Sequence, residues 1–202
     1  MLAARHRLRS VLKFSQEPPP LAAATIGLAL IWVVDATLMH WELAYGVQGV
    51  LDETAHLATG LLFLMALPRR PPKPFVLGCL VASVLIDADH IPIVLHFQPL
   101  IAAAHRPYTH SLSTVAVVLV AGLLMSDARR ACAFGAVAGL LIHFFRDIAT
   151  GFVPLAWPVS TTEAQIPYTY YFALMVALAA AAASHARWPG HAKVRERVEP
   201  VA

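Results

Sequence analysis

Long apolar segments take up most of this chain and leave few folds open to it. Six of them, at about 21–40, 47–67, 75–95, 108–125, 131–150 and 168–185, approach the roughly 20 residues that a helix needs to cross a bilayer. The chain is 58% hydrophobic and only 13% charged, whereas soluble domains carry about 25% charged residues. We therefore predict an all-α, polytopic membrane bundle of about six helices in a single domain, 21–185, between cytoplasmic tails at 1–20 and 186–202.

The lysines and arginines indicate how this bundle is oriented. Of the 15 basic residues, all but Arg106 and Arg146 lie in the two tails or in the loops after the second and fourth segments. Because basic residues mark the cytoplasmic side of a membrane protein, both termini are expected in the cytoplasm, with the bundle in a bacterial inner membrane. Topology then accounts for the net charge of +3, and no nucleic acid partner is expected.

Histidines and aspartates interrupt the apolar segments in short clusters. The clusters are Asp52–His56, Asp87–His90, His105–Ser111, and His143 with Asp147. Ionised groups cost roughly 2.5–3.5 kcal/mol each at a bilayer centre, so the five aspartates in the apolar segments would cost on the order of 10 kcal/mol if unpaired. A bound metal ion offsets a cost of this size, since structural zinc contributes about 10–16 kcal/mol in small peptides.

On the six-span arrangement, all of these clusters lie in the outer third of the bilayer. Asp87 and His143 come late in segments that run outward, whereas His56 and His110 come early in segments that run inward. His143 and Asp147 are four residues apart, so they share one face of a helix. The clusters are therefore expected to form one site that faces the extracytoplasmic side.

The number of imidazole and carboxylate groups predicts a metal site. Such ligands suit zinc, manganese or non-haem iron, with zinc the first expectation and one or two ions in the site. Asp52 is either a ligand or a cap at the start of its helix, and Asp35 is either in the site or a buried residue with a local partner. The candidate ligands are Asp52, His56, Asp87, Asp89, His90, His105, His110, His143 and Asp147.

Several motifs, in this order along the chain, resemble a known family. They are Thr54-Ala55-His56, the DxDH string at Asp87–His90, the HRxxTHS string at His105–Ser111, the HxxxD string at His143–Asp147, and LxWPxS at Leu155–Ser160. Together they resemble the YdjM-like family of LexA-binding, inner membrane-associated proteins, which are described as metal-dependent hydrolases. The likeness covers about residues 52–160, with Ile86 where the family usually has proline. It implies a hydrolase whose metal is held by these motifs.

The chemistry expected of such a site is hydrolysis with metal-activated water, because metal ions lower the pKa of bound water to about 7 and neutralise charge on a phosphoryl oxygen. Arg106 is expected to clamp a phosphate oxygen. Thr109 and Ser111 are expected to donate to an oxyanion, and Asp89 to serve as a ligand or a general base. A head group at the membrane surface reaches this depth most easily, so the expected substrate is a phosphoester or related bond in a membrane lipid or lipid-linked molecule.

Two other classes of function stay open. A non-catalytic membrane scaffold or binding protein would use the metal to hold the bundle together, and complete ligation of the ion by the protein would favour it. A metal or proton transporter would carry polar groups through the inner half of the bundle. The inner halves of the second to fifth segments are apolar, which favours the hydrolase over the transporter.

The end of the chain gives three smaller expectations. The loop 150–167 directly follows Asp147 and is expected to cover the site. Arg146 is expected either to bind phosphate or to balance Asp89. Tyrosines at the start of the sixth segment are expected at the membrane interface, where aromatic residues gather; they are Tyr168, Tyr170 and Tyr171.

Overall fold

The part of the chain that the structure describes is all-helical. The structure is a computed structural model that describes residues 20–91 and 106–185. The helices in these ranges are α2 (Pro20–His40), α3 (Tyr45–Ala66), α4 (Lys73–Leu85), the short 3₁₀ helix η1 (Ile86–His90), α6 (Leu112–Leu124), α7 (Asp127–Thr150) and α8 (Tyr168–His185). Each predicted apolar segment contains one α-helix, which confirms the all-α prediction for the described residues.

Some helix ends differ from the predicted segments, for local reasons. The fourth segment becomes helical only at Leu112, because a turn precedes it in which the His110 N–H donates to the Pro107 carbonyl at 3.0 Å. In the third segment the α-helix ends at Leu85 and tightens into η1. α7 begins earlier than predicted, at Asp127, where a carboxylate favourably meets the positive end of the helix dipole.

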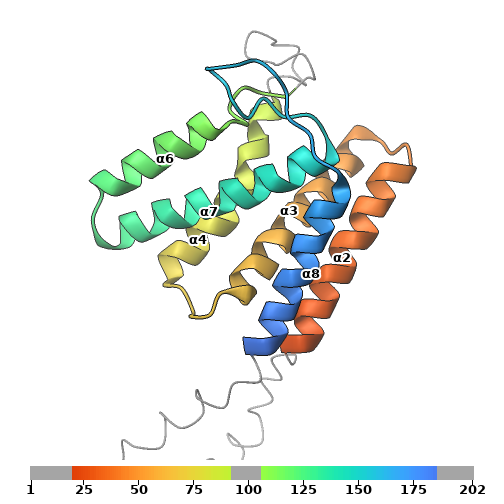
Figure 1. Cartoon of the computed structure of the whole chain (residues 1–202), viewed down its shortest axis with the longest axis horizontal. Coiled ribbons are helices and arrows are strands. Elements are labelled where there is room, and N and C mark those ends of the chain that lie inside the picture. The colour runs from red at the N-terminus through yellow and green to blue at the C-terminus, as the bar shows by residue number, and fades with distance from the viewer. Residues whose placement is uncertain (1–19, 92–105, 186–202) are drawn as a thin grey trace, which may run out of the picture.

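Helix α7 joins two groups of helices (Figure 1). On one side α2, α3 and α8 pack against one another, and on the other α4 and α6 each pack against α7. The main core lies where α2, α3 and α8 meet, with Ile31, Leu62 and Met175 buried. A smaller core around Val115 and Leu140 joins α6 to α7. Residues of α7 therefore face both groups, which places this helix at the centre of the molecule.

Helices α4 and α7 cross in backbone contact. A Cβ atom added at Gly78 would lie 2.0 Å from the carbonyl oxygen of Cys132, and one added at Gly139 would lie 2.2 Å from that of Cys79. Gly135 comes equally close to α4. Small residues permit this approach between helices. The crossing brings the end of α4, and η1 after it, beside the last turns of α7.

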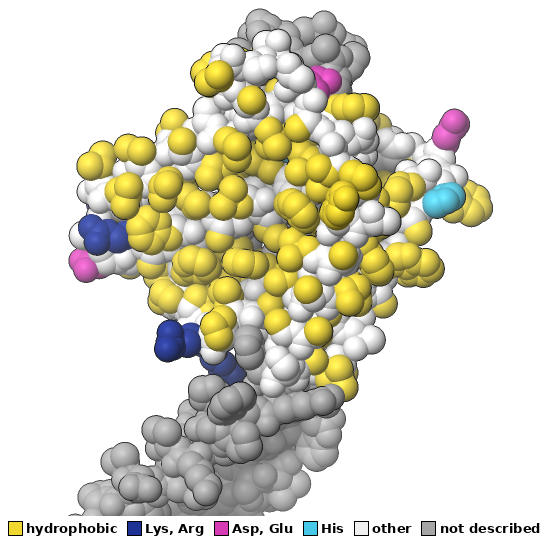
Figure 2. All heavy atoms as spheres, viewed as in Figure 1, with side chains coloured by type: hydrophobic (Ala, Val, Ile, Leu, Met, Phe, Trp, Pro, Cys, Tyr) yellow, Lys and Arg dark blue, Asp and Glu magenta, His cyan; other side chains and the backbone are white. Residues whose placement is uncertain are grey.

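The exposed surface is largely apolar. Figure 2 shows hydrophobic side chains across one face, with the few visible lysines and arginines at its left and lower edges. Large exposed side chains on these helices include Trp32, Val117, Leu124 and Val176. Helices α2 and α7 are long and apolar enough to cross a membrane, by length and composition, and α6 and α8 are shorter apolar helices. Extensive apolar surface of this kind marks a protein that contacts lipid or other partners.

The tyrosines of α8 differ from one another in their surroundings. Tyr170 is exposed, and its position at the membrane interface stays a prediction. Tyr171 is fully buried, and its hydroxyl lies 2.7 Å from that of Thr59. The expectation of an interfacial position is therefore wrong for Tyr171, because α8 turns this side chain into the core between α3 and α7.

Candidate metal centre

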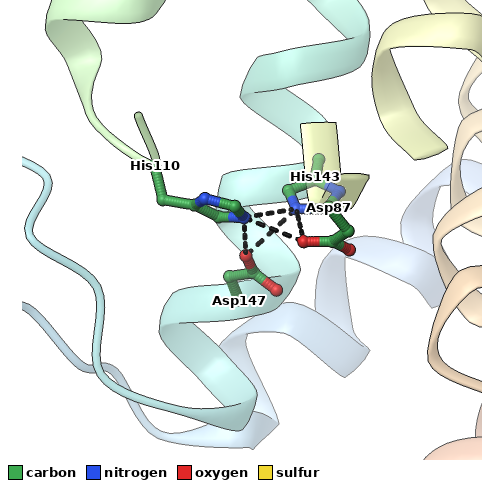
Figure 3. Close-up of side chains that lie close together, drawn as sticks. All are labelled: Asp87, His110, His143 and Asp147. Atoms are coloured by element: carbon green, nitrogen blue, oxygen red, sulfur yellow. Dashed lines mark hydrogen bonds and ion pairs between the residues drawn. The ribbon is translucent and has the colours of Figure 1, made fainter. Parts of the chain in front are cut away.

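Four side chains from three parts of the chain point toward one another (Figure 3). His143 and Asp147 lie one turn apart on α7, Asp87 belongs to η1, and His110 belongs to the turn before α6. His110, His143 and Asp147 are fully buried, and Asp87 is partly exposed. One ligand atom from each lies within 4.8 Å of the others. The four-residue group, as we call these side chains, is therefore a candidate metal centre.

The distances within the four-residue group match those of a metal centre. His110 Nε2 lies 3.4 Å from His143 Nε2 and 2.9 Å from Asp87 Oδ1. Asp87 Oδ1 in turn lies 3.5 Å from His143 Nε2. Asp147 Oδ2 lies 3.1 Å from His143 Nε2 and 3.6 Å from His110 Nε2. Around a tetrahedral zinc ion with bonds of about 2.0–2.1 Å, neighbouring ligand atoms are about 3.3–3.4 Å apart. Five of the six distances among the four ligand atoms thus fit a tetrahedral site.

A carbonyl orients the His143 ring, and a carboxylate lies behind the His110 ring. The Nδ1 atom of His143 lies 2.9 Å from the Ser83 carbonyl oxygen. Because a carbonyl only accepts, Nδ1 carries the proton and a neutral ring turns its Nε2 lone pair toward the group. His110 Nδ1 lies 3.2 Å from Asp89 Oδ2, and Asp89 in turn accepts a hydrogen bond from the Thr109 hydroxyl. Metal-binding histidines commonly have such a carbonyl or carboxylate behind the ring.

Several buried polar atoms in and around the group have no hydrogen-bond partner among the described residues. Asp87 Oδ2 and Asp147 Oδ1 are two of them, and Glu53 Oε2 and His56 Nδ1 are others. An unsatisfied buried polar atom costs about 1–3 kcal/mol, and more if it is charged. The free oxygens of Asp87 and Asp147 belong to carboxylates whose other oxygens face the His110 and His143 Nε2 atoms, and such a buried group of unsatisfied acidic oxygens and imidazoles fits a bound cation. The residues present therefore fit a divalent metal ion.

A second polar cluster, the arginine network, adjoins the four-residue group. The buried side chain of Arg146 donates to Asp35 Oδ1 through Nη2 at 2.7 Å and through Nε at 3.2 Å. Its Nη1 lies 2.5 Å from Asp52 Oδ1 and 2.9 Å from His56 Nε2. Tyr168 completes the network by donating to Asp35 Oδ2 at 2.8 Å. The network ties α2, α3, α7 and α8 together.

A cavity of about 610 Å³ opens beside both clusters. One part of its wall is polar and includes Asp52, Asp87, Arg106 and Arg146. Another part is apolar and comes from the α2–α3 end of the bundle, with Leu38, Met39 and Tyr45. A cavity with one charged side and one apolar side suits an amphiphilic molecule. It reaches the four-residue group at Asp87.

The sequence motifs of this site lie within the range that a protein-family model matches. The model of the YdjM inner membrane protein family matches residues 51–198. The chain belongs to this family. The matched range contains every residue of the four-residue group, whereas Asp35 on α2 precedes it. No curated protein and no solved structure matches the chain.

Most of the remaining predicted ligands of this YdjM-family chain belong to two further groups of potential ligands. His90 Nδ1 lies 3.1 Å from Asp89 Oδ1 and 3.4 Å from Asp87 Oδ1, so these three residues and His110 form a second potential ligand group. Asp52, His56 and Asp87 form a third. His105 lies outside the described residues.

The predicted catalytic residues are also near the centre. Arg106 donates from Nη1 to Asp147 Oδ2 at 2.7 Å, and it lines the cavity. Thr109 contacts Asp89, as described above. The Ser111 hydroxyl is buried and lies 2.7 Å from that of Ser113. Arg106 is thus the predicted residue that joins the metal group to the cavity.

Two expectations for the polar residues are wrong. Arg146 balances Asp35 and Asp52 rather than Asp89, because its position on α7 turns it toward α2 and α3. Asp52 is not a helix cap, because α3 begins at Tyr45 and Asp52 lies well inside it. Asp35 belongs to the arginine network and contacts the four-residue group only through other residues.

Two residues of this region are not among the predicted ones. Glu53 lines the cavity beside Asp87, with one buried carboxylate oxygen. Its signal in the sequence is a second carboxylate within an apolar helix, a pattern that is equally typical of charge at a helix end. Tyr168 binds Asp35 across the bundle, and no local pattern points to a contact between residues so far apart in sequence.

The loop 150–167 packs against the turn that carries His110, and its covering of the site stays a prediction. The Leu112 N–H donates to the Leu155 carbonyl at 2.9 Å, and Trp157 stacks on Tyr108 with ring centroids 5.3 Å apart. These contacts hold the loop against the turn that carries His110. The loop therefore helps to fix one ligand of the four-residue group.

Proposed function

We propose that this YdjM-family protein is a membrane-embedded, metal-dependent hydrolase. Its substrate would be a phosphoester or related bond in a lipid or lipid-linked molecule. The observation that carries the proposal is the convergence of ligand atoms from Asp87, His110, His143 and Asp147, within 4.8 Å of one another, beside an amphiphilic cavity.

The ligand atoms of the four-residue group support the metal. Two imidazoles and two carboxylates suit zinc first, and manganese or iron as well. A divalent ion held there would activate a water molecule and draw charge from a phosphoryl oxygen. The Ser83 carbonyl holds the His143 imidazole in place, and Asp89 lies behind that of His110.

The walls of the cavity support an amphiphilic substrate. Arg106 presents a guanidinium to the cavity beside Asp87, and an arginine can bind two phosphate oxygens at once. Met39 and Tyr45 are exposed and apolar, and they form a rim along which an acyl or prenyl chain would lie. A polar head would thus meet Arg106 while its tail stayed against α2 and α3.

The membrane arrangement is part of the same proposal. We propose six membrane segments with both termini in the cytoplasm. The basic loops between α3 and α4 and between α6 and α7 would lie on the cytoplasmic side. The loop 150–167 and η1 would lie on the opposite side, so the site would be reached from the extracytoplasmic leaflet. A lipid head group at that surface is the natural substrate for this depth.

A second candidate function is a non-catalytic scaffold held together by the metal. One observation favours it, because four protein ligands complete a tetrahedral site and leave no open position for water. The contact between Arg106 and Asp147 weighs against it. Arg106 lines the cavity and also contacts a ligand of the metal group, so it would place a phosphate beside the ion, which a purely structural site does not need.

Metal content and lipid hydrolysis test the proposal together. The full chain is purified in detergent, its metals are measured by mass spectrometry, and phosphate release is followed from phosphatidic acid and from a prenyl diphosphate. The test variant is His143→Ala. The matched control is His40→Ala, because His40 is exposed and bonds only its own helix, at the Ala36 carbonyl.

We expect wild type and His40→Ala to retain metal and release phosphate, and His143→Ala to do neither. Metal without hydrolysis of either lipid would favour the scaffold. Wild-type protein that binds no zinc, manganese or iron would overturn the proposal.

A further inference from the structure

The carboxylates of Asp87 and Asp147 divide their oxygens between two positions. Asp147 Oδ2 faces His143 and His110, whereas Asp147 Oδ1 lies 3.3 Å from His56 Nε2. Asp87 Oδ1 likewise faces His110 and His143, whereas Asp87 Oδ2 lies 3.8 Å from His56 Nε2. A carboxylate that bridges two metal ions presents its oxygens in this way.

From this geometry we infer a second divalent cation position, next to the first and bounded by His56, Asp52, Asp87 and Asp147. The inference rests on the metal centre of the proposed function and extends it to a two-metal site. Asp87 and Asp147 would bridge the two ions. His110 and His143 would complete one position, and His56 and Asp52 the other. Two-metal hydrolytic sites hold their ions about 3.5–4 Å apart, which is a distance that one carboxylate can span.

The oxygens that face the second position are buried and unsatisfied. Asp147 Oδ1 and Asp87 Oδ2 have no hydrogen-bond partner among the described residues. Asp147 is fully buried, so water does not take the place of a partner at its surface. Asp52 Oδ2 lies 3.9 Å from His56 Nε2, and Asp52 and Asp87 both line the cavity. The second position therefore has protein ligands on one side and the cavity on the other.

A positive group already contacts this position. Arg146 Nη1 lies 2.9 Å from His56 Nε2 and 2.5 Å from Asp52 Oδ1. A cation bound there would replace Arg146 on His56, while Arg146 kept Asp35 through Nε and Nη2. The position of the Arg146 guanidinium shows that Asp52 and His56 attract positive charge. Its contacts with Asp35 would hold Arg146 in the protein if a cation displaced it from His56.

The charges of the two clusters also suit two divalent ions. With neutral histidines, two guanidinium groups, Arg106 and Arg146, face more carboxylates than they can balance. The carboxylates are Asp35, Asp52, Asp87, Asp89 and Asp147. Five negative and two positive groups leave three negative charges, which is more than one divalent cation carries. One divalent ion would therefore leave negative charge uncompensated in a largely apolar protein.

Manganese is a suitable probe because two close Mn²⁺ ions change each other's paramagnetic resonance spectrum. The full chain in detergent is stripped with chelator and titrated with Mn²⁺, and bound metal is counted after desalting. The variants are His56→Gln and Asp52→Asn, with His40→Gln as the matched control outside the site. Circular dichroism and size-exclusion chromatography check that each variant is folded.

We expect two equivalents of Mn²⁺ and a coupled spectrum for wild type and His40→Gln. We expect one equivalent and an isolated-ion spectrum for His56→Gln and for Asp52→Asn. One equivalent with an isolated-ion spectrum in wild type would overturn the second position and leave the first centre intact. No bound Mn²⁺, Zn²⁺ or Fe²⁺ in wild type would overturn the metal centre itself. The wild-type spectrum distinguishes one bound ion from two even if a variant fails to fold.

Discussion

Replacing Gly139 by alanine is expected to push α4 and α7 apart and to loosen the metal centre. The added Cβ atom would lie 2.2 Å from the carbonyl oxygen of Cys79. A carbon and an oxygen normally come no closer than about 3.3 Å, so the helices must separate by about 1 Å. The atom in the way belongs to the backbone, so no change of rotamer can relieve the contact.

Two opposing terms set the size of this effect. Overpacking of a close contact costs about 1–3 kcal/mol. Alanine also favours a helix over glycine by about 1 kcal/mol. Because two helices must move rather than one side chain, we expect the upper end of the cost and a net loss of about 2 kcal/mol. For a domain of this size that lowers the melting temperature by roughly 4–8 °C.

The metal centre should respond as well. His143 follows Gly139 by one turn of α7, and Ser83 follows Cys79 by one turn of α4. A separation of about 1 Å would lengthen the 2.9 Å contact between His143 Nδ1 and the Ser83 carbonyl beyond hydrogen-bond range. Loss of such a supporting contact typically lowers metal affinity by about 10- to 100-fold.

The assay compares Gly139→Ala with Gly27→Ala, in detergent, by circular dichroism melting and by metal retained after dialysis. Gly27 lies within α2, and a Cβ atom there would meet nothing within 4 Å. The control thus has the same gain in helix propensity without the clash. Equal melting temperatures and equal metal retention for the two variants would refute the close crossing and its coupling to the site.

Three further predictions concern the metal, the arginine network and the topology. Chelator should lower the melting temperature and added zinc should restore it, because a ligand at about 1,000 times its Kd stabilises a protein by about 4 kcal/mol; an unchanged melting curve would argue against a resident metal. Asp35→Asn should lower the free energy of unfolding by about 3–5 kcal/mol, since it leaves Arg146 short of a buried partner. Tyr168→Phe should lower it by only about 1 kcal/mol. Equal effects of the two variants on urea unfolding would contradict this network. In a background without the two native cysteines, Thr161→Cys should react with an impermeant maleimide from the extracytoplasmic side and Arg70→Cys should not; the reverse pattern would invert the proposed topology.

The meeting of the polar clusters could be predicted because it depends only on depth in the bundle. Asp87 and His143 come late in segments that run one way, and His110 comes at the start of a segment that runs back. Any antiparallel arrangement of those segments brings the residues to the same end. The one-turn spacing of His143 and Asp147 then fixes their common face on α7. Both inferences need only the sequence.

The partners within the site could not be predicted, because they depend on the rotation of each helix about its axis. Arg146 follows His143 in sequence, but it points away from Asp89 and toward Asp35 and Asp52. The polar residues His143, Arg146 and Asp147 lie on more than one side of α7, and the sequence alone does not say which side faces which neighbouring helix. Asp52 was similarly ambiguous, because the start of α3 sets its role and no capping residue marks that start.

The glycines of α7 determine which of its faces meets α4, although the sequence does not say that α4 is the helix that they contact. Gly135 and Gly139 are four residues apart and share one face, which is the face that contacts α4. His143 continues the same spacing and therefore also faces α4, where it meets the Ser83 carbonyl. One residue further round the helix from Asp147, Arg146 is turned to α2 and α3. A stripe of small residues that ends in a histidine thus determines both the distance between two helices and the direction in which a ligand points.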